Sequence, residues 1–133
     1  MSFRRATVAL EWVGEFFRDA DMVQIDKLAA WFADDIDLRF ANNPPIRDKQ
    51  TAVAVMGGFY GSIAGMSHKP VHLYAGDDGD TASQYAVVTY TRQDGRDVPL
   101  PVSSLLHRNS AGKLDKLWIY IDINPLYAEA EAQ

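Results

Sequence analysis

The sequence changes its hydrophobic periodicity once, near residue 67, and this change limits the folds it can adopt. The apolar residues of the first part recur at the spacing of one helical face: Val8, Trp12, Val13, Phe16 and Phe17. That spacing is typical of an amphipathic helix. After residue 67, apolar and polar side chains alternate between turn-forming sequences, which indicates antiparallel strands. Helices that precede such strands define the α+β class.

Two further helices are predicted before the change. Asp21 is placed to cap the second helix, whose apolar face runs over residues 25–32, because a carboxylate accepts hydrogen bonds from the first free backbone amides. The third helix begins at Asp48 or Thr51 and runs through residue 60. We expect a strand over residues 36–41 between these two helices, since the Asn-Asn-Pro-Pro sequence that follows suits neither a helix nor a central strand.

Four more strands follow, and turn sequences rich in Asp, Gly and Ser separate them. They cover residues 71–74, 81–93, 98–108 and 114–123. Pro99 and Pro101 stand two residues apart, so both can face away from one hydrogen-bonded neighbour, as at a strand end or edge. The predicted order is ααβαββββ. We expect one domain over residues 1–133, since 133 residues fit one domain of ordinary size.

Composition excludes several classes of function. The chain carries 13 basic and 18 acidic residues and a net charge of −5, so nucleic acid and anionic membranes are not predicted partners. It has no cysteine, which excludes thiol nucleophiles and thiolate metal sites. The uncharged run over residues 50–68 is interrupted by glycines and polar residues, so it is interpreted as a buried helix and its exit. A cytoplasmic protein without cofactor is expected.

Four short sequences carry a resemblance to a known family: residues 31–35 (Trp-Phe-Ala-Asp-Asp), residues 42–45 (Asn-Asn-Pro-Pro), Gly112-Lys113, and residues 120–122 (Tyr-Ile-Asp). With the element order, they make the chain similar to the nuclear-transport-factor-2-like superfamily and its SnoaL-like polyketide cyclase branch, over about residues 5–127. The resemblance implies a cone-shaped, cystatin-like roll, with three helices packed on a curved, mainly antiparallel sheet around an apolar pocket. Residues 128–133 are expected to be a frayed tail.

The resemblance also places the family's catalytic positions on residues of this chain. The ketosteroid isomerase tyrosine falls on Phe16, and its two aspartates fall on Phe40 and Ser104. The polyketide cyclase acid–base aspartate falls on Ile119. Asp122 lies three residues further, so it faces the other side of a regular strand unless a bulge intervenes.

The set used by epoxide hydrolases of this superfamily is mostly replaced as well. Its arginine falls on about Tyr85, its aspartates on about Val87 and on Ile119, and its tyrosine on Phe40; only the asparagine is kept, as Asn42. Neither steroid isomerisation nor epoxide hydrolysis is therefore expected, because removing one such group typically lowers the rate by ~100-fold or more.

Two hypotheses follow. The first is a non-catalytic protein that binds a small, mostly apolar, neutral ligand, since no lysine or arginine is placed to meet a charge. The predicted ligand-binding residues are Phe16, Phe40, Asn42, Tyr60, Tyr85, Ser104 and Ile119.

The alternative is an acid–base enzyme of the cyclase, isomerase or dehydratase type, acting on a small apolar cyclic or carbonyl substrate. Its candidate groups are Asp122, His107, or one histidine of the pair His68 and His72. A carboxylate or imidazole that points into the cavity would favour this alternative. No metal site is expected at the pair, since a third ligand is missing at suitable spacing.

The last strands predict a homodimer. Apolar residues occupy both faces of residues 117–121, and a monomer would leave a large apolar patch in water. Tyr90, Trp118 and Tyr120 are predicted to form the interface on the outer face of the sheet.

Overall fold

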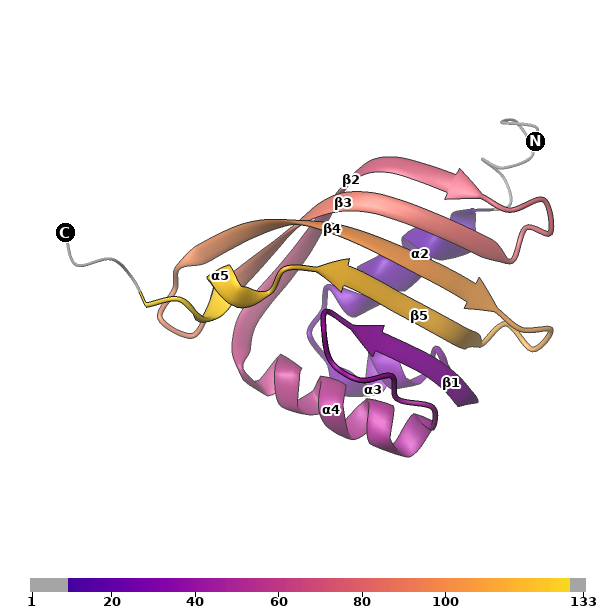
Figure 1. The fold of residues 1–133 in the computed structure, drawn as a ribbon, viewed down its shortest axis with the longest axis horizontal. Coiled ribbons are helices and arrows are strands. Elements are labelled where there is room, and N and C mark those ends of the chain that lie inside the picture. Colours follow the sequence, from indigo (N-terminus) through magenta and orange to yellow (C-terminus); the bar gives the residue numbers. More distant parts are fainter. Residues whose placement is uncertain (1–9, 130–133) are drawn as a thin grey trace.

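The structure is a computed structural model, and it describes residues 10–129. Element labels follow Figure 1. The helices are α2 (Glu11–Ala20), α3 (Ile25–Ala29), α4 (Lys49–Gly61) and a short α5 (Asn124–Tyr127). The strands are β1 (Phe32–Phe40), β2 (Ile63–Ala75), β3 (Thr81–Arg92), β4 (Asp97–Arg108) and β5 (Leu114–Ile121). The predicted α+β class and the order ααβαββββ are confirmed, and α5 is added at the end.

The five strands form one sheet in the order β1-β5-β4-β3-β2. β1 pairs with β5 in parallel, and the other neighbours are antiparallel. The long strands bend over α2, while α3 and α4 lie beside β1 (Figure 1). This arrangement confirms the predicted curved sheet with helices on one side.

Strict alternation along β3 and β4 defines two faces of the sheet. In β3 every second residue is buried: Ala82, Gln84, Ala86, Val88 and Tyr90. Because successive strand residues point to opposite faces, these side chains form an inner face that packs on the helices. Their neighbours in sequence form an outer face that no element of the described chain covers.

The sequence predicted a cap at Asp21 and a helix that begins at Asp48 or Thr51, and only the second expectation is confirmed. Asp48 caps α4, and its Oδ2 accepts a hydrogen bond from the Thr51 backbone amide at 2.8 Å, a contribution of about 1 kcal/mol. The cap predicted at Asp21 is wrong, because α3 begins after Gln24 without a side-chain cap. Asp21 instead ends α2, and its carboxylate contacts His68 on β2.

Strand limits differ from the sequence prediction in two places. β2 begins at Ile63, directly after α4, whereas alternation was recognised only from residue 71. β1 begins at Phe32, where the second helix was expected to continue, and its pairing with β5 is irregular between Phe32 and Asp37. The edge predicted for Pro99 and Pro101 is confirmed, since β5 pairs with β4 only from Val102 onward. Val8 and residues 130–133 lie outside the described chain.

Candidate functional site

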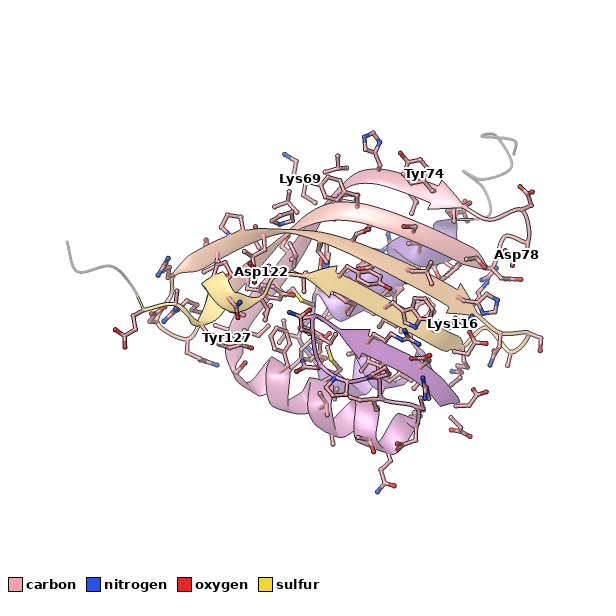
Figure 2. All side chains as sticks on the ribbon, in the orientation of Figure 1. Lys69, Tyr74, Asp78, Lys116, Asp122 and Tyr127 are labelled. Atoms are coloured by element: carbon pink, nitrogen blue, oxygen red, sulfur yellow. The ribbon has the colours of Figure 1, made fainter. Side chains whose placement is uncertain are left out.

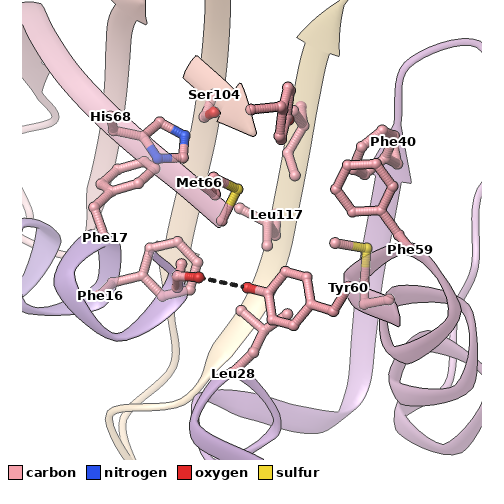
Figure 3. Close-up of a pocket in the computed structure, with 14 residues that line it drawn as sticks. Phe16, Phe17, Leu28, Phe40, Phe59, Tyr60, Met66, His68, Ser104 and Leu117 are labelled. Carbon is pink, nitrogen blue, oxygen red and sulfur yellow. Dashed lines mark hydrogen bonds between the residues drawn. The ribbon is translucent and has the colours of Figure 1, made fainter. Parts of the chain in front are cut away.

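A mostly apolar cavity lies between the inner face of the sheet and the helices (Figure 3). The centre of a water molecule can occupy a volume of about 40 Å³ in this cavity. Its lining comes from three helices and all five strands. The residues are Phe16, Phe17, Ala20, Leu28, Phe40, Met56, Phe59, Tyr60, Met66, His68, Tyr90, Ser104, Leu117 and Ile119. An enclosed apolar space with a few polar groups is the usual form of a small-molecule site.

Five predicted ligand-binding residues line this cavity together: Phe16, Phe40, Tyr60, Ser104 and Ile119. They come from α2, β1, α4, β4 and β5. The convergence that the resemblance implied for the helix, the first strand and the last strand is therefore present in the structure. Whether these residues bind a ligand stays a prediction.

Two other predicted ligand-binding residues lie elsewhere. Tyr85 is 42% exposed and is absent from the cavity wall, because the alternation of β3 directs odd-numbered residues to the outer face. Asn42 is exposed in the turn after β1 and does not reach the cavity either. Both placements correct the sequence prediction.

The assignment of Tyr90 to an outer dimer interface is also wrong. Tyr90 is only 3% exposed, and it lines the cavity opposite Phe59 with ring centroids 5.4 Å apart. Trp118 and Tyr120 do lie in outward positions of β5, and Tyr120 is 56% exposed. The sequence showed alternation within each strand, but it did not show how the phase of β3 relates to that of β5.

The two residues named as catalytic alternatives lie outside the cavity. Asp122 is exposed just after β5, and its Oδ1 accepts a hydrogen bond from the Asn124 backbone amide at 3.1 Å. Figure 2 shows Asp122 at the junction between β5 and α5. His107 lies at the far end of β4, where its Nδ1 is 2.5 Å from Asp115 Oδ1. Neither group has access to a ligand in the cavity.

His68 contributes an imidazole to the wall of the cavity. It occupies an inner position of β2, paired with Val88 of β3, and its ring is directed into the cavity beside Phe17 (Figure 3). The ring centroids of His68 and Phe17 are 4.7 Å apart. Only 9% of the His68 side chain is exposed, so a bound ligand would meet this imidazole with little water around it.

Asp21 holds His68 with both carboxylate oxygens. Oδ1 lies 2.6 Å from Nδ1 of the ring, and Oδ2 accepts a hydrogen bond from the His68 backbone amide at 2.9 Å. An ionised carboxylate has no proton to donate, so Nδ1 carries the hydrogen of this bond. In the neutral ring, Nε2 then keeps its lone pair, and it makes no hydrogen bond within residues 10–129.

The position of Asp21 is otherwise unfavourable. It follows the last residue of α2, where the negative end of the helix dipole disfavours a carboxylate by about 0.3–1 kcal/mol. Two residues later Val23 has a φ of 54°, a left-handed conformation that costs a β-branched residue on the order of 1–2 kcal/mol. Strain of this kind is concentrated at functional sites.

Three hydroxyl groups complete the polar part of the cavity. Tyr60 donates a hydrogen bond to the Ala20 carbonyl at 2.8 Å (Figure 3). Burial raises the pKa of Tyr60 and that of Tyr90 well above the usual tyrosine range, so both phenols stay protonated. Tyr90 and Ser104 also line the cavity, and each has a hydroxyl group that can donate a hydrogen bond to a ligand.

Sequence reasoning named His68 only as one member of a histidine pair, and it gave Asp21 a different role. The signal for His68 was available, because its separation from Met66 places both on one face once β2 is known to begin at Ile63. No local pattern joins Asp21 to a residue 47 positions away. His72 pairs with Tyr85 on the outer face, so the two histidines do not share a site.

Within residues 10–129, no three His, Asp or Glu side chains gather as ligands of one metal ion. Over the same residues, no helix has the length and apolar character needed to cross a membrane.

Comparison with known proteins identifies the fold. No protein-family model matches the sequence, and no curated protein is similar to it. Solved structures are similar over most of both chains. SalBIII, an epoxide hydrolase/cyclase-like enzyme with a role in pyran ring formation in polyether salinomycin, superposes with a TM-score of 0.75 at 16% identity, covering 89% of this chain and 93% of SalBIII.

Two further solved structures have the same fold as this chain. A protein of Jannaschia sp. CCS1, provisionally assigned as a SnoaL-like polyketide cyclase, has a TM-score of 0.73 at 15% identity, covering 91% of this chain and 90% of its own. An NTF2-like protein of unknown function from Exiguobacterium sp. 255-15 has a TM-score of 0.67 at 18% identity, covering 83% and 97%. The chain therefore has the nuclear-transport-factor-2-like fold, in the form that SnoaL-like polyketide cyclases share.

Proposed function

We propose that the protein is an acid–base enzyme that acts on a small, neutral, largely apolar carbonyl compound, with His68 as the proton acceptor. The observation that carries this proposal is the His68 imidazole, which lines an apolar cavity while Asp21 fixes its other nitrogen. The sequence alone favoured a non-catalytic binding protein. An imidazole in the cavity is the feature that favours the enzyme instead.

The proposed step is removal of a proton from a carbon next to the carbonyl. Nε2 of His68 accepts the proton, the C–H bond breaks, and its electron pair forms the enolate, whose charge lies on the oxygen. Asp21 keeps the ring in the required tautomer and stabilises the imidazolium that forms. Return of the proton from Nε2 to another atom of the enolate system gives isomerisation. Attack of the enolate carbon on a second carbonyl closes a ring, and Nε2 then returns the proton to the new alkoxide oxygen.

The enolate oxygen needs a hydrogen-bond donor, and the inner face offers two. Tyr90 and Ser104 present hydroxyl groups to the same cavity, and the raised pKa of Tyr90 keeps its phenol protonated. In a space from which water is largely excluded, such donors stabilise developing charge more strongly than they do in water. These residues are the proposed electrophilic side of the site.

The lining also supports the substrate class. The cavity wall includes no lysine or arginine among the described residues, so a carboxylate substrate would be buried without a partner. It includes no Asp or Glu either, which leaves His68 as the base. SalBIII, which has the same fold, has a role in pyran ring formation, so this fold is compatible with an enzyme that closes a ring.

Proton exchange in a simple ketone tests the proposal without knowledge of the natural substrate. Cyclopentanone in D₂O exchanges its α-protons when a base removes them, and ¹H NMR follows the loss of signal. We expect the protein to accelerate exchange, and His68→Gln to reduce the enzymatic rate by about 100-fold or more. His107→Gln, which removes a histidine outside the cavity, is the matched control and should retain the full rate. Exchange no faster than in buffer, or equal loss in both variants, would contradict the proposal.

We also propose that the protein is a cytoplasmic homodimer that associates through the outer face of the sheet. Trp118 and Tyr120 support this, since Tyr120 is exposed and Arg39 stacks on Trp118 at 4.2 Å from the ring centroid. Tyr85 lies on the same face, in register with Ser103 and thereby with Tyr120. Light scattering at micromolar concentration tests the proposal, and a monomer would contradict it.

A further inference from the structure

We infer that the substrate is elongated, with its reactive end in the inner cavity and its remaining part in a groove outside Phe59. The groove lies between α4, the turn after β1 and the segment that contains α5. This inference deepens the proposed function and rests on it for the neutral, carbonyl nature of the ligand. The division of the site into two compartments rests on the structure.

Three apolar side chains separate the two compartments. Phe40, Met56 and Phe59 line both the inner cavity and the groove. The rings of Phe40 and Phe59 lie side by side at one wall of the cavity, with centroids 5.0 Å apart (Figure 3). Phe59 also packs edge-on against Tyr90 of β3, with ring centroids 5.4 Å apart. A rotamer change at Phe59 or Met56 would therefore join the two spaces.

The sizes of the two compartments differ by an order of magnitude. The inner cavity offers about 40 Å³ to the centre of a water molecule, and the groove offers about 430 Å³. One water needs about 10–15 Å³ by this measure, so the inner cavity holds about three waters. A ring or carbonyl group matches that space once the apolar side chains adjust. A longer molecule must continue past Phe59 into the groove.

The chemistry of the groove indicates what the second part of the substrate is like. Val55 and Tyr127 expose 42% and 60% of their surfaces there. The described residues that line the groove carry no charge, and Asn43 contributes the principal amide. An uncharged, mainly apolar chain with a single hydroxyl or carbonyl suits this lining better than an ionised group.

Gly58 makes the groove deep, and it offers a direct test. It lies on the groove side of α4, and a Cβ built there would meet no atom within 4 Å. A large side chain at this position can therefore fill the groove without a clash, while it raises the helix propensity of α4. Gly61 of the same helix also has no atom within 4 Å of such a Cβ and does not line the groove. Gly61→Phe is the matched control.

The experiment measures affinities of 2-alkanones from butanone to 2-nonanone by isothermal titration calorimetry. For the unchanged protein, we expect affinity to rise about threefold with each added methylene, since each buries apolar surface. Gly58→Phe should remove this dependence and leave butanone binding unchanged, whereas Gly61→Phe should preserve it. Val55→Lys, at an exposed position of the groove, serves as a second variant should Gly58→Phe fold poorly.

Affinity that does not depend on chain length, or that keeps its dependence in Gly58→Phe and Val55→Lys, would overturn the inference. This outcome differs from failure of the proposed function. Exchange of cyclopentanone protons is assigned to the inner cavity, so its absence in the unchanged protein would contradict the proposed function and not the division into two compartments. Conversely, a chain-length dependence that Gly58→Phe removes would support the two compartments even without proton exchange.

Discussion

The sheet carries a histidine–aspartate pair on each of its faces, and the two pairs have almost the same geometry. On the inner face, His68 Nδ1 lies 2.6 Å from Asp21 Oδ1; at the end of the outer face, His107 Nδ1 lies 2.5 Å from Asp115 Oδ1. Their surroundings differ. The His68 side chain is 9% exposed and the His107 side chain 31% exposed. A histidine–aspartate pair alone therefore does not define a site. The cavity around His68 distinguishes the inner pair from the outer one.

The aspartates differ in their place in the fold rather than in exposure, which is 24% for the Asp21 side chain and 27% for that of Asp115. Asp21 comes from a helix, spans 47 positions to His68, and also accepts the His68 backbone amide. Asp115 lies only eight positions from His107, on the neighbouring strand. A local, partly exposed pair of this kind contributes about 0–1 kcal/mol, and neither His107 nor Asp115 lines the cavity or the groove. The inner pair joins two distant elements at the wall of a cavity.

The largest difference between the two faces is expected in the free energy of unfolding, when Ile119→Asp is compared with Tyr120→Asp. These neighbours in β5 point to opposite sides of the sheet. Ile119→Asp should lower the free energy of unfolding by about 3 kcal/mol, because it places a carboxyl group without a partner in the cavity. Desolvation should raise the pKa of the new carboxyl group. Urea denaturation at low protein concentration provides the measurement.

Tyr120→Asp should leave the same unfolding free energy within about 0.5 kcal/mol, as most exposed substitutions do. If both variants lose stability equally, the outer face is not free in the monomer. If Ile119→Asp loses none, the phase assigned to β5 is wrong.

The next difference concerns the aspartates of the two pairs. Asp21→Asn should lower the free energy of unfolding by about 2 kcal/mol, because it weakens two hydrogen bonds that a charged group makes to His68, whose side chain is only 9% exposed. Asp115→Asn should cost less than about 1 kcal/mol. Equal effects in thermal or urea denaturation would show that enclosure adds nothing to the inner pair.

A smaller effect is expected for assembly. Tyr120→Asp should raise the dissociation constant of the proposed homodimer by about tenfold or more, since exposed aromatic side chains often dominate interfaces. His68→Gln, on the inner face, should leave that constant unchanged. Sedimentation equilibrium distinguishes the two. If the wild type is a monomer, or if Tyr120→Asp leaves the dimer intact, the proposal that the protein dimerises through the outer face is contradicted.

The smallest effect separates buried from exposed tyrosines at high pH. Burial raises the pKa of Tyr90 in the folded chain, so the folded state favours the protonated phenol. The resulting stability is complete below the unfolded pKa of about 10 and declines as the pH rises above it, toward the folded pKa.

Tyr90→Phe should therefore retain about 1 kcal/mol more of its neutral-pH stability at pH ~11 than the wild type does. Tyr74→Phe, at a residue that is 57% exposed, is the control and should follow the wild-type pH profile. Identical profiles for all three proteins would contradict the placement of Tyr90 in the cavity.

Much of the fold could be predicted from the sequence because its information is local. A few consecutive residues determine each of three features: the periodicity of α2, the start of α4 at Asp48, and the turns between strands. Pro99 and Pro101 even indicated a free edge, which the short pairing of β4 with β5 provides. The start of β2 was missed, because the glycines of α4 and the prolyl residue at position 70 obscured the alternation between them.

Part of the site could be predicted from the resemblance to a known family. Phe16, Phe40 and Ile119 were placed in the cavity from the resemblance, and the structure brings them together. Tyr85 and Tyr90 were assigned to the wrong faces, since the relation between strands depends on register rather than on either strand alone. The contact between Asp21 and His68 depends on the packing of α2 against β2, which no local sequence pattern specifies.

The central claim is that His68 offers an unprotonated Nε2 to a ligand in the cavity while Asp21 holds Nδ1. ¹⁵N NMR of the histidine rings tests this directly, with phenol added as a small apolar hydrogen-bond donor. We predict that neutral His68 is protonated at Nδ1, and that phenol shifts its Nε2 resonance while leaving the resonances of His107 unchanged. A proton on Nε2 in the neutral ring, or a phenol response at His107 and none at His68, would contradict the account.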